Sequence, residues 1–244
     1  MTVIQKPPTT IPKRGDETQK NKLDYSALTD LACVLLTLVT IKQLLLPYSI
    51  LLAGPASTLS AMIVSTWLLK YRGTSWSDLG LRKPKSTVKT LALSVLVFFT
   101  IAVVANAASW LSDPFLEDVG TSGRFDFIRG NLLAYLGMLV LIWTHGSVFE
   151  ELLFRAFLIT RAAVFLGGGF KSEILAILFA STFFGYRHYY YQGLKGAFIT
   201  GTIGLALSLL YLWFGKKNIW PLIIGHGVVN TISQTTRFLG LKGD

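Results

Sequence analysis

Cysteine is almost absent from this sequence, and charge is scarce. Cys33 is the only cysteine among 244 residues, so an intrachain disulfide and a cysteine-ligated zinc site are both excluded. Charged residues make up 15% of the chain, against about 25% in an ordinary soluble protein, while 52% of the residues are hydrophobic. This composition is typical of a membrane protein whose apolar segments run along the whole chain.

The start of the chain lacks the apolar core of a secretory signal peptide. Residues 1–24 are polar and contain Pro7, Pro8 and Pro12. We therefore predict a disordered basic cytoplasmic tail over residues 1–24 and a single helical transmembrane domain over residues 25–240. The formal charge of +10 arises mostly from the tail and from loops beside apolar runs, which predicts contact with the lipid bilayer and not with nucleic acid.

The apolar runs predict an all-α fold: a polytopic integral membrane helical bundle of about seven transmembrane helices, with eight as the alternative count. Pro47, the run Gly167-Gly168-Gly169 and Pro221 are expected to mark helix ends. The predicted spans are residues 25–46, 56–69, 88–111, 131–165, 174–190, 197–214 and 219–239.

Lysine and arginine predict the orientation of these spans. They gather in the tail, after the second span and in residues 215–218, and seven spans place all three regions on the cytoplasmic side. The acidic loop of residues 112–130 then faces the other side. In this threading Glu150 and His188 meet only if their helices are staggered or if one segment is re-entrant.

An acidic pair, Glu150 and Glu151, interrupts an apolar stretch, and Arg155 follows. Each central charge in a membrane helix costs about 2.5–3.5 kcal/mol, so such a cluster indicates function. Glu151 and Arg155 are four residues apart and share a helix face, whereas Glu150 is rotated by about 100°. One acid can therefore pair with Arg155 while the other points into a cavity as a general base. A helix-packing ion pair is the structural alternative.

Two further histidines lie in later apolar runs. His188 follows Phe184 by four residues, and His226 precedes Asn230 by four, which places His226 and Asn230 on one helix face. Both groups can donate hydrogen bonds to a developing oxyanion. The structural alternative is hydrogen bonding between membrane helices.

Three other polar residues are assigned no chemistry. His145 lies about 140° around an α-helix from Glu150, so we predict a structural role for it. Arg187 is expected at the membrane interface, together with the tyrosines that follow it. Ser147 has no evident base partner, which argues against a serine mechanism.

In this order, the motifs resemble the CPBP family of intramembrane proteases, which includes CAAX prenyl endopeptidases and bacterial members linked to bacteriocin processing and self-immunity. The family's motifs are Glu-Glu-x-x-x-Arg, Phe-x-x-x-His and His-x-x-x-Asn. The resemblance covers about residues 131–235, and it departs at Ala156, where many members have glycine. The matching residues here are Glu150, Glu151 and Arg155, then Phe184 and His188, then His226 and Asn230.

The resemblance implies a glutamate endopeptidase in which Glu150 and His188 activate a water and His226 and Asn230 form the oxyanion hole. The residues that support them are Glu151, Arg155 and Phe184. No cofactor and no metal ligand are implied. A zinc site made by Glu, His, His and Asn is the chemical alternative.

The same resemblance implies a membrane-associated peptide or protein substrate and a bacterial plasma membrane, and the distribution of lysine and arginine predicts that the N-terminus lies in the cytoplasm. Two alternatives belong to other classes of function. One is a non-catalytic immunity or scaffold protein of the same fold, and the other is a transporter or proton relay, because such proteins also carry ionisable residues in membrane helices. The sequence carries no signal for the oligomeric state.

Overall fold

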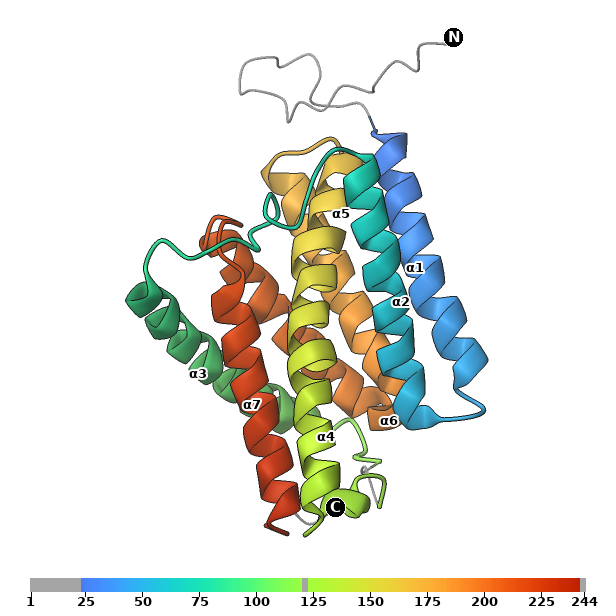
Figure 1. Cartoon of the computed structure of the whole chain (residues 1–244), viewed down its shortest axis with the longest axis vertical. Coiled ribbons are helices and arrows are strands. Elements are labelled where there is room, and N and C mark those ends of the chain that lie inside the picture. The colour runs from blue at the N-terminus through green and yellow to red at the C-terminus, as the bar shows by residue number, and fades with distance from the viewer. Residues whose placement is uncertain (1–22, 120–122, 242–244) are drawn as a thin grey trace.

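The computed structural model describes residues 23–119 and 123–241, and these form a bundle of long helices without a strand (Figure 1). The predicted tail of residues 1–24 lies outside the described part of the chain, apart from Leu23 and Asp24. The fold is therefore a helical membrane bundle, as the composition predicts. The helices in chain order are α1 (Tyr25–Leu45), α2 (Ile50–Tyr71), α3 (Thr87–Ser112), the short 3₁₀ helix η2 (Asp126–Ile128), α4 (Leu132–Trp143), the π-helices η3 (Thr144–Phe149) and η4 (Glu151–Leu158), α5 (Ile159–Phe165), α6 (Phe170–Trp213) and α7 (Trp220–Phe238).

Short polar residues start four of the helices. The side chains of Asp24, Ser49, Ser86 and Asn131 accept hydrogen bonds from backbone N–H groups in the first turns of α1, α2, α3 and α4. Helix α1 ends two residues before Pro47, and α5 ends just before a three-glycine turn at positive φ, as predicted. These caps fix where each apolar run enters and leaves the bundle.

Helix α2 is longer than its predicted span of residues 56–69. It begins at Ile50 and continues through Pro55. The Ser49 Oγ atom caps its start by accepting from the Leu52 N–H at 3.2 Å. Pro55 is the sixth residue of the helix and has no backbone N–H, so one hydrogen bond is missing near the start of the helix. A hydrogen bond missing there destabilises the helix less than one missing in its middle. Ile50, Leu51 and Gly54, which belong to these extra turns, line a cavity.

Helix α6 folds back on itself at Gly193. This residue has φ 65° and ψ −169°, which breaks the helix into two arms. Ser181 Oγ on the first arm lies 3.4 Å from Ser208 Oγ on the second, and Glu173 pairs with Lys216 beyond the end of the second arm. The arms are therefore antiparallel (Figure 1). Gly185 and Gly201 let them approach closely, since a Cβ at Gly185 would clash with the backbone oxygen of Ala197.

Five helices of the described chain are long and apolar enough to cross a membrane, namely α1, α2, α3, the continuous helix over residues 132–165, and α6. The predicted count of seven or eight is not reproduced. The predicted spans 174–190 and 197–214 form one helical element that turns at Gly193. The last predicted span, α7, is not among these five helices. It carries His226, Asn230, Gln234 and Arg237 along its length.

The continuous helix of residues 132–165, called the central helix below, has its second half in the core of the bundle. Every residue of η4 is buried, and Leu153, Phe157 and Leu158 are fully enclosed. In Figure 1 the lower end of α4 reaches beyond the turn of α6. This stagger brings Glu150 and His188 to the wall of one cavity, so no re-entrant segment is needed.

A buried ion-pair cluster joins three helices at the upper end of the bundle. The carboxylate of Asp30 on α1 has no exposed surface and lies 2.9 Å from Arg72 Nη2 and 3.3 Å from Arg161 Nε. Arg72 follows α2, and Arg161 belongs to α5. One acid therefore compensates two cations and ties α1, α2 and α5 together.

Candidate active site

The two acids of the pair have different surroundings. Glu151 is fully buried, with Oε1 2.8 Å from His226 Nδ1 and Oε2 3.3 Å from Arg155 Nε. Glu150 lines a cavity instead. Glu151 is thus fixed by Arg155 and His226, while Glu150 faces the cavity.

Arg155 links the first motif to the second. Its guanidinium carbon lies 4.3 Å from the centre of the Phe184 ring, which is a cation–π geometry. Its Nη1 and Nη2 atoms have no hydrogen-bond partner within the described part of the chain, so the ring and Glu151 carry most of its compensation. Gly204 on the second arm of α6 leaves room for both, because a Cβ there would lie 3.0 Å from the Phe184 ring.

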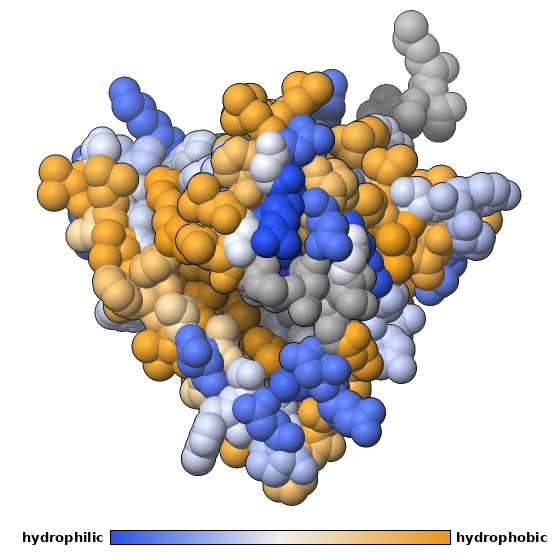
Figure 2. Space-filling view, turned by 90° about the horizontal axis from the view of Figure 1, so that it is seen from below, coloured by the Kyte–Doolittle hydropathy of each residue, from blue (hydrophilic) through white to orange (hydrophobic). Residues whose placement is uncertain are grey.

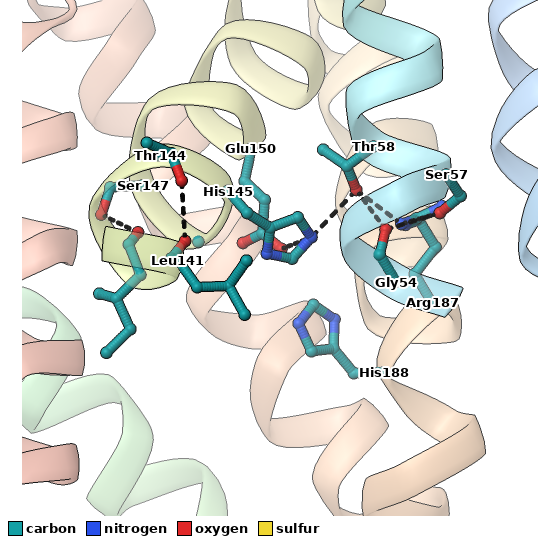
Figure 3. A network of polar contacts seen from close by, with 12 residues as sticks. Gly54, Ser57, Thr58, Leu141, Thr144, His145, Ser147, Glu150, Arg187 and His188 are labelled. Atoms are coloured by element: carbon teal, nitrogen blue, oxygen red, sulfur yellow. Dashed lines mark hydrogen bonds and ion pairs between the residues drawn. The ribbon is translucent and has the colours of Figure 1, made fainter. Parts of the chain in front are cut away.

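His145 belongs to the site, although α-helical geometry places it away from Glu150. Residues 144–149 and 151–158 are π-helical, and the Glu150 N–H donates to the His145 carbonyl five residues earlier. This i to i+5 pattern brings residues five apart to the same side of the helix. The His145 Nε2 atom lies 3.9 Å from Glu150 Oε1 and 3.1 Å from Thr58 Oγ1 (Figure 3). The predicted position, about 140° around the helix from Glu150, is therefore wrong, and the predicted structural role of His145 stays a prediction.

His188 lies on the other side of the same cavity. Its Nδ1 atom is 2.7 Å from the Phe184 carbonyl oxygen. A carbonyl only accepts hydrogen bonds, so Nδ1 carries the proton and Nε2 of the neutral ring is left as the acceptor. The ring also packs edge-on against Phe184 at 4.7 Å and lies beside Tyr191 at 5.6 Å. These contacts fix both the tautomer and the orientation of the imidazole.

The cavity has a volume of about 180 Å³ and is lined by residues of α2, the continuous helix of residues 132–165, α6 and one loop. Glu150, His145 and His188 supply its titratable anion and its two imidazoles, and Arg187 and Arg124 supply cationic groups. A larger groove of about 410 Å³ adjoins it and shares Pro55, Leu141 and His145. The other residues along that groove are mostly apolar, so an apolar chain fits beside the polar cavity.

Arg187 is buried at the cavity and not at the membrane interface as predicted. Its Nη2 atom donates to Ser57 Oγ at 3.1 Å and to Thr58 Oγ1 at 3.0 Å, and Nη1 donates to the Leu38 carbonyl at 3.3 Å. Its own carbonyl accepts from Lys42 Nζ at 2.7 Å. The sequence held one signal for this position, since Ser57 and Thr58 give α2 two hydroxyls in an apolar run. Figure 3 shows this cation next to Thr58, the residue that also contacts His145.

The third motif lies behind the cavity wall. Asn230 donates through Nδ2 to the Gly146 carbonyl at 3.1 Å, and Gly146 itself lines the cavity. His226 Nδ1 faces Glu151, so that atom carries the ring proton in the neutral form. Gly225 and Gly227 admit close neighbours on both sides, because a Cβ at either would come within 3 Å of Val97 or of Trp143. Two of the residues predicted from the sequence, Glu150 and His188, line the cavity. The other predicted residues lie behind its wall, namely Glu151, Arg155, Phe184, His226 and Asn230.

Two other chemistries, a metal site and a serine nucleophile, need their own sets of side chains. No group of three or more His, Cys, Asp or Glu side chains in the described ranges is arranged to hold a metal ion, and a catalytic zinc site usually needs three such ligands. Ser147 Oγ donates to the Ile142 carbonyl at 3.1 Å, so its hydroxyl is directed to backbone and not to a base. The arrangement around Glu150 can perform carboxylate and imidazole chemistry.

Comparison with protein families gives a match in the same region. Residues 132–232 match the model described as type II CAAX prenyl endopeptidase Rce1-like. Neither the curated proteins nor the solved structures gave a match. The family match spans the acidic pair of the first motif and the histidines of the second and third motifs. It confirms the resemblance to CAAX proteases that these motifs predict.

Proposed function

Starting from the Rce1-like match over residues 132–232, we propose that this integral membrane protein is an intramembrane glutamate endopeptidase. It hydrolyses a peptide bond in a membrane-associated peptide or protein. One observation carries the proposal: Glu150 faces a cavity between two imidazoles, while its neighbour Glu151 is held by Arg155 and His226. A carboxylate base beside neutral imidazoles is the arrangement that activates a water.

In the proposed reaction a water in the cavity gives its proton to Glu150 as its oxygen bonds to the substrate's carbonyl carbon. His188 accepts a hydrogen bond from that water through Nε2, because its Nδ1 proton is committed to the Phe184 carbonyl. The tetrahedral intermediate then collapses with cleavage of the C–N bond. The proton held by Glu150 passes to the leaving nitrogen, so a free amine and a carboxylic acid are formed.

We propose His226 and Asn230 as the donors that stabilise the oxyanion. Asn230 keeps one amide N–H after its bond to the Gly146 carbonyl. His226 donates through Nε2 when the ring is protonated, and the adjacent Glu151 carboxylate then faces the charged ring. Both residues lie on the helix face next to the turn that carries Gly146 and Glu150. Removal of one such donor typically costs about 10²–10³ in kcat.

The proposed membrane arrangement counts the two arms of α6 separately. With α1, α2, α3, the helix of residues 132–165 and α7, this gives seven crossings. The N-terminus then lies in the cytoplasm of a bacterial cell, by the distribution of lysine and arginine. No metal enters the proposed mechanism, and the proposed partners are the substrate segment and the lipid bilayer.

The test is cleavage of a quenched fluorescent peptide library by detergent-purified protein. Wild type, Glu150→Gln and His226→Ala are assayed in parallel, each with and without a chelator. We expect activity that survives the chelator and is lost in Glu150→Gln. Activity that disappears with chelator and returns with zinc would replace the glutamate mechanism by a zinc-dependent one. A Glu150→Gln variant that supports the native cellular phenotype would instead indicate a non-catalytic immunity or scaffold role.

A further inference from the structure

Two neighbouring hydroxyls on α2 lie inside the bundle, close to the site but not at its surface. Ser57 and Thr58 have no exposed surface, and neither lines the cavity at Glu150 or the groove beside it. Seen from the lower end, apolar side chains cover much of the flanks of the molecule (Figure 2), as expected of a surface that contacts lipid. The two hydroxyls therefore depend on partners inside the protein for their hydrogen bonds.

The contacts of Thr58 determine the position of one proton. Its Oγ1 atom lies 3.0 Å from the Gly54 carbonyl oxygen, and a carbonyl only accepts, so the hydroxyl proton points to Gly54. Arg187 Nη2 lies 3.0 Å from the same Oγ1 atom and can only donate. A hydroxyl has one proton and two lone pairs, so one lone pair is left for the third neighbour, His145 Nε2 at 3.1 Å. His145 therefore donates to Thr58 through Nε2.

A second contact of His145 agrees with a proton on Nε2. The same atom lies 3.9 Å from Glu150 Oε1, and a carboxylate attracts an N–H and repels a ring lone pair. The neutral ring of His145 thus carries its proton on Nε2, whereas the ring of His188 carries it on Nδ1. The two imidazoles at the cavity are opposite tautomers: His188 presents an acceptor through Nε2, and His145 presents a donor through Nε2 (Figure 3).

We infer that Thr58 is a positioning residue for the proposed reaction: it binds the Nε2 proton of His145 and holds the imidazole back from Glu150. The hydroxyl is nearer to Nε2 than the carboxylate is, at 3.1 Å against 3.9 Å. Without the hydroxyl, Glu150 is the next acceptor for that proton, and a carboxylate oxygen that binds the imidazole is no longer available to the water. The effect on catalysis rests on the proposed function, whereas the tautomer of His145 does not.

Ser57 provides a matched control on the same turn of α2. Its Oγ atom accepts from the same Arg187 Nη2 at 3.1 Å and donates to the same Gly54 carbonyl at 2.8 Å, whereas the contact to His145 belongs to Thr58. Ser57→Ala therefore removes one anchor of Arg187 and leaves the bond between Thr58 and His145 in place. Thr58→Val removes the hydroxyl with little change in shape, and Thr58→Ser keeps it.

Two measurements on the full-length protein in detergent test the inference. In the first, histidine is labelled with an NMR-active nitrogen isotope, and the ring resonances show which nitrogen of each imidazole carries a proton. The chain has three histidines, so the resonances that disappear in His145→Gln are those of His145. In the second, the best-cleaved peptide of the fluorescent library gives kcat and KM for wild type, Thr58→Val, Thr58→Ser and Ser57→Ala. Thermal unfolding shows that each variant is folded, and Thr58→Ala replaces Thr58→Val if that variant is not.

We expect the proton of His145 on Nε2 in the wild type and a changed Nε2 resonance in Thr58→Val. The same variant should lower kcat by about 10-fold or more, with KM little changed because Thr58 lines neither the cavity nor the groove. Thr58→Ser and Ser57→Ala should keep most of the activity and the wild-type resonances of His145.

Three results would overturn the inference. One is a proton on Nδ1 of His145 in the wild type, and another is a Thr58→Val variant with the resonances and kcat of the wild type. The third is an equal loss of kcat in Ser57→Ala, which would assign the effect to the anchoring of Arg187. If no peptide is cleaved by the wild type, the proposed function fails, and the spectra of wild type and Thr58→Val still decide whether Thr58 sets the proton of His145.

Discussion

His226 Nδ1 lies 2.8 Å from Glu151 Oε1, deep in the bundle, between residues that are 75 positions apart in the chain. Glu151 has no exposed surface, and its second oxygen faces Arg155 at 3.3 Å. The bond therefore connects α7 to the central helix through a charge that has no access to solvent. It also explains how two adjacent acids differ, since only Glu150 remains at the cavity.

Neutralising Glu150 should lower activity, whereas neutralising Glu151 should lower thermal stability. Glu150→Gln keeps the shape of the side chain and removes the base, so we expect a loss in kcat of about 10²–10⁴ with little change in thermal stability. Glu151→Gln leaves Arg155 without its carboxylate, and breaking a buried pair costs about 3–5 kcal/mol. Peptide cleavage and thermal unfolding of the detergent-solubilised variants measure both effects. Equal melting temperatures for the two variants would contradict the division between them.

His145 should matter for activity because of the π-helical turn that brings it to Glu150. Replacing it by glutamine keeps a donor toward Thr58 and removes the imidazole. We expect His145→Gln to lower kcat by about 10-fold or more, with the fold retained, because imidazoles near a general base typically contribute to proton transfer. Thr144→Val is the matched control on the exposed side of the same turn. If both variants kept full activity, His145 would have only a structural role.

The close contact between the arms of α6 predicts a sharp difference between two glycines. In Gly185→Ala the new Cβ meets the backbone oxygen of Ala197, which cannot rotate away. Overpacking of this kind costs about 1–3 kcal/mol or more, so the melting temperature should fall. Gly137→Ala on α4 has open space around the new atom, and alanine favours the helix by about 0.5–1 kcal/mol. Equal stability of the two variants would show that the arms are not packed as described.

Two aspartates provide a matched comparison of ion pairs. Asp30→Asn removes the charge shared by Arg72 and Arg161, and we expect a loss toward the lower end of about 3–5 kcal/mol, because Arg72 is partly exposed. Asp113→Asn removes a pair with Lys195 in which the carboxylate is 53% exposed. Exposed pairs contribute about 0–1 kcal/mol. Thermal unfolding in detergent distinguishes them, and a larger effect at Asp113 would be the contrary result.

The sequence predicted the parts of this molecule that depend on local composition. Apolar runs, proline and glycine positions located most helix ends, and the four-residue spacing of Glu151 and Arg155 predicted their pairing. The predicted second span began at residue 56, whereas α2 begins at Ile50, is capped by Ser49 and continues through Pro55. A capping residue so close to a proline gives no strong local signal.

The site departs from prediction where the geometry is not α-helical. His145 was placed about 140° from Glu150 on the assumption of an α-helix, and the i to i+5 pattern removes that separation. Arg187 was predicted at the membrane interface because tyrosines follow it, whereas the tertiary structure places it against Ser57 and Thr58. The hydroxyls of Ser57 and Thr58 are a signal on another helix, and the contact between His145 and Glu150 depends on a rare backbone conformation.

The π-helical stretch makes the length of the central helix part of the site. Between Leu132 and Phe165 each residue fixes the rotation of all those that follow it along the helix axis. Deleting one residue between Leu141 and Glu150, with the winding otherwise unchanged, would turn the residues on one side of the deletion by about 100° against those on the other. Met138 and Leu141, which line the cavity before the π-helical stretch, would then no longer face it together with Glu150. Insertions and deletions should accumulate in loops such as residues 72–86, while this stretch keeps a constant number of residues.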